Sequence, residues 1–454
     1  MRRVLAVVLV AATITMVGSA ASQEPAADLQ DLVDATPTGG VLTLEAGIYR
    51  GGVLIDRPLT LQGVGWPVVD AGGEGTAIEV RAPDVTISGL VIANTGASLD
   101  RENAGVSAWG APRLVLEDNR FEDVLFGMFL RESPDSVVRG NTVGAKDVDI
   151  ARRGDGIRVW ESHRTLVEGN TVVGGRDSVM WFSDDLVIRD NHVSDGRYGL
   201  HFMYSDRAVI ERNVLEGNSV GAFLMYSRDL VFTENHVADS FGPSGYGMGL
   251  KDMDGVEARG NRFVGNRIGV YFDNSPMTYG VSQHFTDNLI AFNEVGLEFL
   301  PSVKGNVFSG NGFLENREQV GVVGGGRFDG NQWTADGTGN YWDDFAGYDA
   351  DADGLGDIPY RLDDLYSALT DDHPELTFFA ETPAATAVDM AARMFPTFRP
   401  RPKVVDDAPL IDLPTVSGAP SPGTPSSAAL LGVSAAMVAV AGIVVGAGRK
   451  LGTP

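Results

Sequence analysis

The middle of the chain repeats one pattern of apolar and polar positions. A segment of alternating residues ends at an Asn, a short turn follows, and a second alternating segment begins at a small residue, usually Gly. The Asn positions are Asn119, Asn141, Asn170, Asn191, Asn213, Asn235, Asn261, Asn288 and Asn306. Eight residues after six of them stands a small residue: Gly127, Ser178, Gly199, Gly221, Gly269 or Gly296. The commonest step between successive Asn residues is 21–22 residues, which is typical of a repeat protein.

Alternation with a period of two predicts β-strands, and one repeat has room for three short ones. Stacked repeats bond to one another through their backbones at about 4.8 Å spacing. Gly permits a positive φ at a corner, and an Asn there can bond to the Asn of the next coil. A β-propeller is the competing architecture, but its blades need about 40 residues or more. We therefore predict an all-β, right-handed parallel β-helix over residues 23–335, with a short capping helix at 28–33.

Equivalent residues of stacked repeats form columns, and their polarity separates the interior from the surface. The first and third residues after the Gly position are apolar in every repeat, so they are predicted to point inward, Val179 and Trp181 among them. The second and fourth residues must then point outward: Phe129, Arg158, Met180, His201, Phe223, Tyr271 and Glu298 in one column, and Arg131, Trp160, Phe182, Met203, Met225, Asp273 and Leu300 in the other. From residue 158 to 225 these outward columns are aromatic and Met-rich.

An outward face of this composition has three interpretations. A loop or the C-terminal tail covers it and makes it core, or it is a protein-docking face, or it is a soft-metal site. Large exposed apolar patches mark interaction sites. The candidate docking residues are Trp160, Phe182, Tyr204, Phe223, Tyr226 and Tyr271.

The soft-metal interpretation rests on thioethers placed close together. Met203 and Met225 occupy the same column on adjacent coils, and His201 precedes Met203 by two residues on the same face. Thioether and imidazole ligands suit Cu(I). The candidate copper ligands are therefore Met180, His201, Met203 and Met225, for a copper ion that is held transiently.

An acidic loop follows the repeats, within a segment at 336–375 that is predicted to form a loop and cap. Asp349, Asp351, Asp353 and Asp357 stand at positions 1, 3, 5 and 9 of the loop, with Gly354 at position 6. This spacing matches the first nine positions of a calcium-binding loop. Position 12 is a Tyr and not the usual Glu, so a single structural Ca²⁺ competes with a solvated acidic turn.

The two ends of the chain predict export and a membrane anchor. Residues 1–22 have the basic start, apolar stretch and small residues of a signal peptide. Residues 428–448 form an uncharged apolar run that is followed by Arg449 and Lys450, so this helix would cross the membrane with the rest of the chain outside. A tail and linker at 376–427 precede it.

Composition narrows the candidate partners. The chain has no cysteine, which excludes disulfides and thiolate metal sites. Its formal net charge of −26 argues against nucleic acid, because phosphate binding requires a basic face.

Three segments resemble the NosD family, the exported accessory proteins for maturing nitrous oxide reductase. They are 199–205 (GLHFMYS), 221–227 (GAFLMYS) and 339–344 (GNYWDD), the last leading into the acidic loop. The resemblance runs from about residue 25 to about 415 and includes a candidate amphipathic helix near 387–395. It implies a β-helix that works with an ABC-type transporter and a copper chaperone to assemble the copper–sulfur site of the reductase. The apolar run at 428–448 departs from that family's usual pattern.

The expectation is thus a non-catalytic scaffold on the outer face of the cytoplasmic membrane. The alternative is a polysaccharide lyase, hydrolase or epimerase, because such enzymes also use the β-helix. They need clustered carboxylates or basic groups in a groove. The best acidic candidates are Asp184 with Asp185, and Asp149 with Asp155, and they stand near predicted turns.

Overall fold

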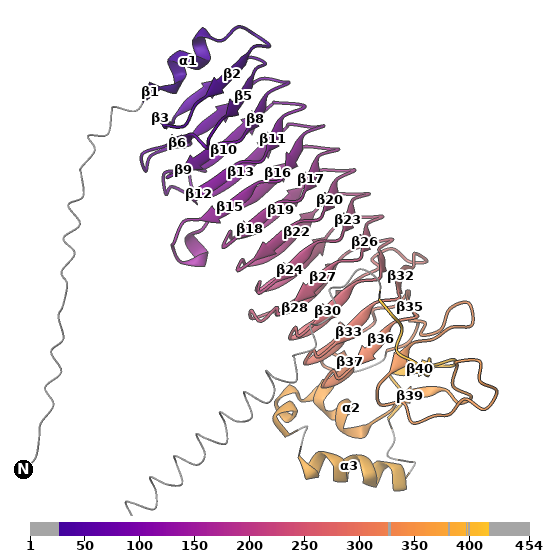
Figure 1. Ribbon diagram of the computed structural model, residues 1–454. Coiled ribbons are helices and arrows are strands. Elements are labelled where there is room, and N and C mark those ends of the chain that lie inside the picture. Colours follow the sequence, from indigo (N-terminus) through magenta and orange to yellow (C-terminus); the bar gives the residue numbers. More distant parts are fainter. Residues whose placement is uncertain (1–26, 326–327, 380–381, 396, 398–399, 417–454) are drawn as a thin grey trace, which may run out of the picture.

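The computed structural model describes residues 27–325, 328–379, 382–395, 397 and 400–416. Most of them wind into a coil of short strands whose turns stack along one axis (Figure 1). The strands form three long sheets of 14, 12 and 12 strands, which we name sheets A, B and C, and every pairing within these sheets is parallel. The predicted parallel β-helix is confirmed.

Sheet C carries the residues of interest for function. In chain order its strands are β4 (Val53–Ile55), β7 (Ile78–Val80), β10 (Ala104–Trp109), β13 (Phe126–Arg131), β16 (Ile157–Trp160), β19 (Asp177–Trp181), β22 (Tyr198–Met203), β25 (Val220–Met225), β28 (Tyr246–Lys251), β31 (Ile268–Asp273), β34 (Val295–Phe299) and β37 (Glu318–Val322).

Sheets A and B complete each coil. Sheet A contains β1 (Ala27–Asp28), β3 (Ile48–Arg50), β6 (Val68–Asp70), β9 (Val91–Ala93), β12 (Arg120–Val124), β15 (Thr142–Ala145), β18 (Thr171–Val173), β21 (His192–Ser194), β24 (Val214–Glu216), β27 (His236–Ala238), β30 (Arg262–Val264), β33 (Leu289–Ala291), β36 (Gly312–Leu314) and β38 (Tyr341–Trp342). Sheet B contains β2 (Val41–Leu44), β5 (Thr60–Gly63), β8 (Thr86–Ser88), β11 (Val115–Glu117), β14 (Val137–Arg139), β17 (Leu166–Glu168), β20 (Val187–Arg189), β23 (Val209–Glu211), β26 (Val231–Thr233), β29 (Glu257–Arg259), β32 (Gln283–Thr286) and β35 (Asn306–Ser309).

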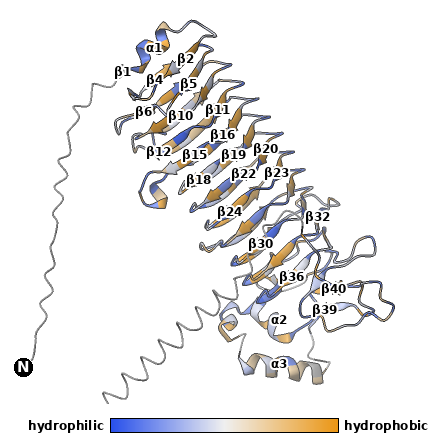
Figure 2. Cartoon of the chain, viewed as in Figure 1, coloured by the Kyte–Doolittle hydropathy of each residue, from blue (hydrophilic) through white to orange (hydrophobic). Residues whose placement is uncertain are grey.

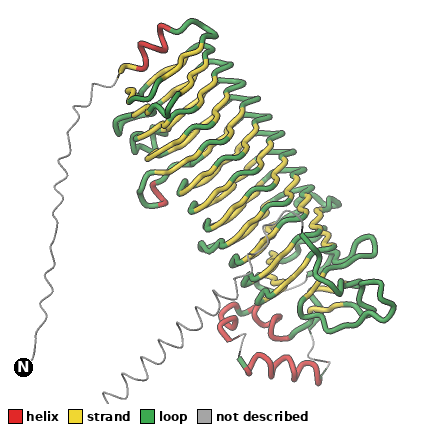
Figure 3. Tube along the Cα trace, viewed as in Figure 1, coloured by secondary structure: helices red, strands yellow, loops and turns green. Residues whose placement is uncertain are grey.

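The described helices lie mainly at the two ends of the coil, as the red segments of Figure 3 show. Helix α1 (Leu29–Ala35) covers the first coils with buried Leu29 and Val33, close to the predicted capping helix. The short η1 (Ile150–Arg152) lies in a loop. At the other end α2 (Leu365–Asp372), η2 (Pro374–Phe379), α3 (Pro383–Met394) and the antiparallel pair β39 (Tyr360–Leu362) and β40 (Val404–Asp406) form a cap. The candidate amphipathic helix overlaps α3.

A ladder of buried Asn side chains fixes one corner of the coil. The backbone N–H and Nδ2 of Asn119 both donate to Oδ1 of Asn141, at 3.0 and 3.1 Å, and the same pair of bonds recurs from coil to coil. The ladder continues through Asn170, Asn191, Asn213, Asn235, Asn261, Asn288, Asn311 and Asn340. Asn306, which the repeat pattern placed in this ladder, instead bonds to Asn331 in a second corner.

The glycines that begin the sheet C segments serve a different purpose from the one predicted. Gly199 and Gly221 do not have positive φ. Positive φ occurs at other corners, for example at Gly140, Gly169 and Gly260 just before ladder Asn residues, and at many Asp and Glu residues. A Cβ on Gly199 would lie 2.5 Å from the carbonyl oxygen of Gly221. Gly is therefore required by the close approach of the next coil and not by a corner.

One apolar core runs along the axis, and Figure 2 shows hydrophobic and hydrophilic positions alternating along the strands around it. The predicted inward columns are fully buried in most coils, with Phe202, Leu224 and Phe272 each 0% exposed. The coil of β19 is the exception, and three predictions for it are wrong. Val179 stands between Arg158 and His201 in the outward column, although it is only 1% exposed. Met180 pairs with Val159 and Phe202 and is 0% exposed inside the core, whereas Trp181 pairs with Trp160 and Met203 on the outer side and is partly exposed.

Among the described residues, no helix is long and apolar enough to cross a membrane. The predicted signal peptide at 1–22 and the predicted membrane helix at 428–448 lie outside the described residues.

Candidate functional site

The outer side of sheet C carries a continuous row of aromatic and Met side chains from β16 to β25. Trp160, Trp181, Met203 and Met225 follow one another in strict register on four successive strands. Together with Phe182, Tyr204, Phe223 and Tyr226 we call them the aromatic face. Neighbouring members of this row sit on strands about 4.8 Å apart, so their side chains are in reach of one another.

Three stacked rings form the edge of the aromatic face, at the corner that follows each strand. Phe182 and Tyr204 stack at 5.1 Å between ring centroids, and Tyr204 and Tyr226 stack at 5.0 Å. All three residues have positive φ, but so do Glu132 and Glu161 at the same corner of earlier coils. The coil requires the backbone conformation there and not an aromatic side chain.

The aromatic face is not covered by any other part of the described chain. Phe182 is 41% exposed and Tyr204 is 46% exposed, while Met203 and Met225 are half-buried. The described residues therefore do not support the interpretation of this face as core covered by a loop.

Further aromatic contacts extend the face toward the C-terminal end. Tyr246 stacks on Tyr271 at 4.3 Å and meets Phe223 edge-on at 6.1 Å. The sequence pattern missed the coil that contains Tyr246, because the step from Asn235 to Asn261 is 26 residues instead of 21–22. The wider spacing of that Asn pair could have indicated a coil with a longer loop between the two residues.

His201 lies on the outer side of β22 but is almost buried. Its Nδ1 is 3.4 Å from Oδ2 of Asp177, and its ring is flanked edge-on by Tyr198 and Trp181. Arg197 binds the same carboxylate through two nitrogens, with Nε 2.9 Å from Oδ1. Burial acts to raise the pKa of Asp177, but the hydrogen bonds with His201 and Arg197 outweigh it and hold this pKa below its usual value.

The structure thus brings together three of the four candidate copper ligands. His201 and Met203 are two residues apart on β22, and Met225 is the register partner of Met203 on β25. Met180 is separated from them, because its side chain points into the core. Met180 therefore cannot bind copper together with the other three residues.

The acidic loop brings three of its four candidate ligands into one cluster. Carboxylate oxygens of Asp349, Asp351 and Asp353 lie within 4.8 Å of one another. Asp349 also accepts hydrogen bonds from the backbone N–H groups of Ala352 and Gly354. Asp357 lies outside this cluster and accepts from the backbone of residue 350 at 2.6 Å.

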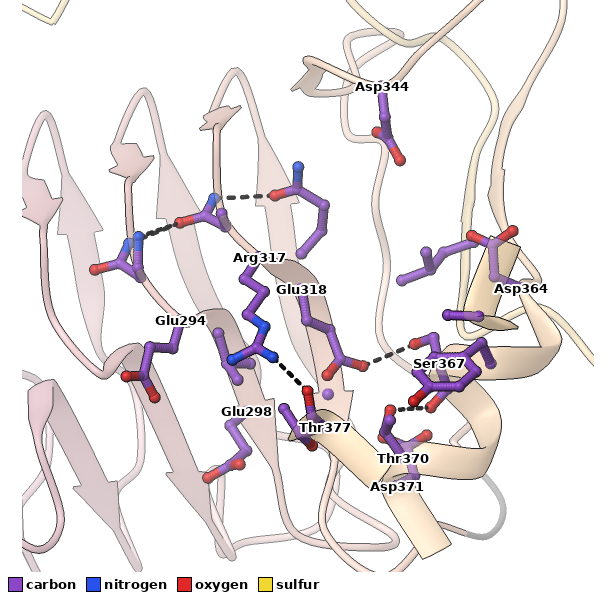
Figure 4. Close-up of a pocket in the computed structure, with 18 of the residues that line it drawn as sticks. Glu294, Glu298, Arg317, Glu318, Asp344, Asp364, Ser367, Thr370, Asp371 and Thr377 are labelled. Carbon is purple, nitrogen blue, oxygen red and sulfur yellow. Dashed lines mark hydrogen bonds between the residues drawn. The ribbon is translucent and has the colours of Figure 1, made fainter. Parts of the chain in front are cut away.

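A large pocket of about 1200 Å³ lies where the outer side of sheet C meets the cap (Figure 4). Glu298, on the column of Phe223 and Tyr271, contributes to it from β34, and Asp371 contributes from α2. Burial raises the pKa of Glu298 to about 7 and that of Asp371 to about 6. Lys403 binds both Asp371 and Glu318 and ties the cap to β37. No pattern in the sequence predicts this pocket, because segments far apart along the chain form it.

The acidic residues considered for an enzyme are held in structural contacts. Asp155 is fully buried between Arg158 and Arg176, and Asp149 caps η1 through the backbone N–H of Ala151. Asp184 and Asp185 pair with one arginine on the outer surface. These four carboxylates form no common cluster.

Comparison with known proteins establishes the family. Residues 144–347, which include the aromatic face, match the family described as Periplasmic copper-binding protein (NosD). The chain is 31% identical over 398 residues to a Pseudomonas aeruginosa protein named "Probable ABC transporter binding protein NosD", with 84% of this chain and 90% of that protein covered. This chain belongs to the NosD family. A Stutzerimonas stutzeri NosD of the same printed name is 27% identical over 390 residues, with 82% of this chain and 87% of that protein covered.

The fold of this NosD chain also resembles a solved enzyme. The A-module of mannuronan C-5 epimerase AlgE4 from Azotobacter vinelandii superimposes with a TM-score of 0.50 at 14% identity, covering 69% of this chain and 97% of that module. At this identity the likeness shows a shared right-handed parallel β-helix and nothing about activity.

Proposed function

We propose that this NosD-family protein is an extracytoplasmic, non-catalytic scaffold for assembly of the copper–sulfur site of nitrous oxide reductase. Its relatives are named ABC transporter binding proteins, and the family is described as periplasmic and copper-binding. The proposed partners are an ABC-type transporter with its ATPase and permease subunits, a copper chaperone and the reductase. The predicted segment at 428–448 would keep the scaffold at the outer face of the cytoplasmic membrane.

The aromatic face is the observation that carries this proposal. A soluble β-helix normally covers its outer side with polar and charged residues, yet here stacked rings and thioethers remain exposed over four coils. Aromatic residues dominate the binding energy of protein interfaces. We assign docking to Trp160, Phe182, Tyr204, Phe223, Tyr226 and Tyr271.

Copper fits the donor atoms on the same face. Two thioethers in register and one nearby imidazole are soft and borderline ligands, which favour Cu(I) over Ca²⁺ or Mg²⁺. In this proposal His201, Met203 and Met225 hold Cu(I) transiently at the surface on which partners dock. A bound Cu(I) would supply a soft ion for ligand exchange with a chaperone or with the reductase.

Binding to purified partners tests the docking role. Trp160→Ala with Tyr226→Ala should weaken binding to the ABC-type transporter or to the copper chaperone by at least about thirtyfold, as expected for two aromatic hot spots. Trp66→Ala is the matched control, because Trp66 is 40% exposed at the corner between β5 of sheet B and β6 of sheet A, outside sheet C. Unchanged affinity of the double variant for both partners would reject the aromatic face as the docking surface.

We also propose a structural Ca²⁺ in the acidic loop, held by Asp349, Asp351 and Asp353 with Asp357 nearby. Asp351→Ala with Asp353→Ala should remove any rise in melting temperature that Ca²⁺ produces, because an ion that binds only the folded chain stabilises it. An equal loss of stability in chelator and in Ca²⁺ would show an acidic turn without an ion.

A further inference from the structure

The imidazole of His201 is held with one nitrogen toward the protein and the other without a partner. Its side chain is 9% exposed, and Nδ1 lies 3.4 Å from Oδ2 of Asp177. Among the described residues, no hydrogen bond to Nε2 is found, and this nitrogen is not one of the fully buried polar atoms that lack a partner. The protein therefore holds one nitrogen of the imidazole, while the other reaches the surface and is open to a ligand.

Asp177 is itself fixed in place. Its side chain is 1% exposed, and Arg197 binds both of its oxygens. The Arg197 guanidinium in turn lies 4.4 Å from the ring centre of Tyr198. The carboxylate therefore has one orientation in which it can meet the imidazole.

Two aromatic rings fix the plane of the imidazole. Tyr198 meets it edge-on at 4.8 Å and 77°, and Trp181 meets it at 5.4 Å and 85°. Trp181 is also the register partner of Met203. The ring is thus held between the buried carboxylate on one side and the row that carries the thioethers on the other.

We propose that Asp177, locked by Arg197, is a positioning residue that keeps the proton of His201 on Nδ1, so that the lone pair on Nε2 faces outward as a Cu(I) ligand beside Met203 and Met225. This inference rests on the copper role proposed above. A metal binds the imidazole nitrogen that lacks the proton, and the hydrogen bond at the other nitrogen decides which one that is. Removal of such an outer partner typically weakens metal binding about 10–100-fold.

A second His–carboxylate pair supplies the control. His192 Nε2 lies 2.8 Å from Oε1 of Glu216 on sheet A, with both side chains 45% exposed and remote from the thioethers. Glu216→Gln removes a carboxylate from a histidine without touching the proposed site. Cu(I) affinity should then stay at the wild-type value.

The experiment measures Cu(I) affinity and the tautomer of His201 in the same set of full-length variants. Competition with a chromogenic Cu(I) chelator gives the affinity, and nitrogen NMR of ¹⁵N-histidine gives the protonated nitrogen in metal-free protein. Asp177→Asn should weaken Cu(I) binding about 10–100-fold and reduce the Nδ1–H tautomer of His201, whereas His201→Ala should weaken it further. Trp181 emission should be quenched by Cu(I), and Trp181→Phe should remove that quenching.

The outcomes separate this inference from the copper role. A wild-type protein that binds no Cu(I) would reject the copper role and with it this use of Asp177. Wild-type binding with an Asp177→Asn variant of equal affinity and unchanged tautomer would reject the positioning role alone. If Asp177→Asn does not fold, Arg197→Gln replaces it, since Arg197 is 42% exposed; it frees the carboxylate and should shift both readouts in the same direction.

Discussion

The outer sides of sheets B and C belong to the same coils, yet they present opposite chemistry. On the sheet B side, arginines pair with acids of the preceding coil: Arg189 with Glu168 at 2.7 Å, and Arg212 with Asp190 at 2.9 Å. On the sheet C side of these coils stand the rings and thioethers of the aromatic face.

The coil itself does not account for this difference. Both sheets are parallel and keep the same coil-to-coil spacing, so the backbone places equal demands on both outer sides. The paired arginine and acidic side chains on sheet B suit an outer side that faces water. The aromatic face is an exception that function has to explain.

The largest expected effect is on stability, and it compares a buried methionine of sheet C with one on the outer side of the same sheet. Met180→Ala removes a side chain that is 0% exposed in the core, and it should lower the free energy of unfolding by about 2–5 kcal/mol. Met203→Ala, on the outer side of the next coil, should change it by about half a kcal/mol or less. Chemical denaturation of both variants measures the difference. Equal losses would mean that Met203 is core and that the aromatic face is not a surface.

The next largest effect is a pH dependence of the free energy of unfolding. It arises from Glu298, which lies on the outer side of sheet C beside the cap. Between about pH 4.5 and 7 the folded chain keeps a proton on Glu298 that the unfolded chain has released, because burial raises the pKa of Glu298 to about 7. The free energy of unfolding therefore falls as pH rises through this window. Glu298→Gln should stabilise the protein by about 1–3 kcal/mol at pH 8 and leave it unchanged near pH 4.

Thermal melting of wild type and Glu298→Gln from pH 4 to 8 checks this prediction. Parallel curves for the two proteins would show that the pocket wall leaves Glu298 solvated and that the cap does not desolvate this end of sheet C.

The smallest effect is expected on the sheet B side. Arg212→Ala breaks pairs with Asp190 and Glu211, but its side chain is 43% exposed, so the loss of stability should stay within about 1 kcal/mol and shrink in high salt. Partner binding and Cu(I) affinity should not change. A large loss of partner binding would show that the charged side also docks and would end the contrast between the two sides.

Sequence periodicity predicted the parts of the fold that repeat. The Asn ladder and the inward columns arise from local spacing, and they were found because equivalent residues recur at a nearly fixed step. The grouping of His201, Met203 and Met225 followed from the same spacing.

Periodicity failed where one coil departs from the repeat. Asp177 pairs with Tyr198 while Val179 pairs with His201, so β19 is one residue shorter at this point than β22. Ser178 was aligned with Gly199, and the shift exchanged inside and outside for Val179, Met180 and Trp181, as a one-residue slip must. The local sign of this change in the sequence is Asp177, which stands where the next coil has the aromatic residue Tyr198.

The remaining site features depend on contacts that no repeat encodes. The bond of Asp177 to His201 requires the register of neighbouring coils, and the pocket requires α2 and α3 to fold back on β34 and β37. Such tertiary contacts between distant segments leave no periodic trace in the sequence.

The stacking of coils also makes distance along this protein adjustable in steps. Four coil steps separate Met225 on β25 from the capped strand β37, or about 19 Å. Duplicating one coil between them would move the cap away from the thioethers by a single strand spacing while leaving each side's own chemistry intact. The distance between two sites on the outer side of the solenoid is therefore a whole number of coil spacings. A partner that contacts both the thioethers and the cap must match that distance.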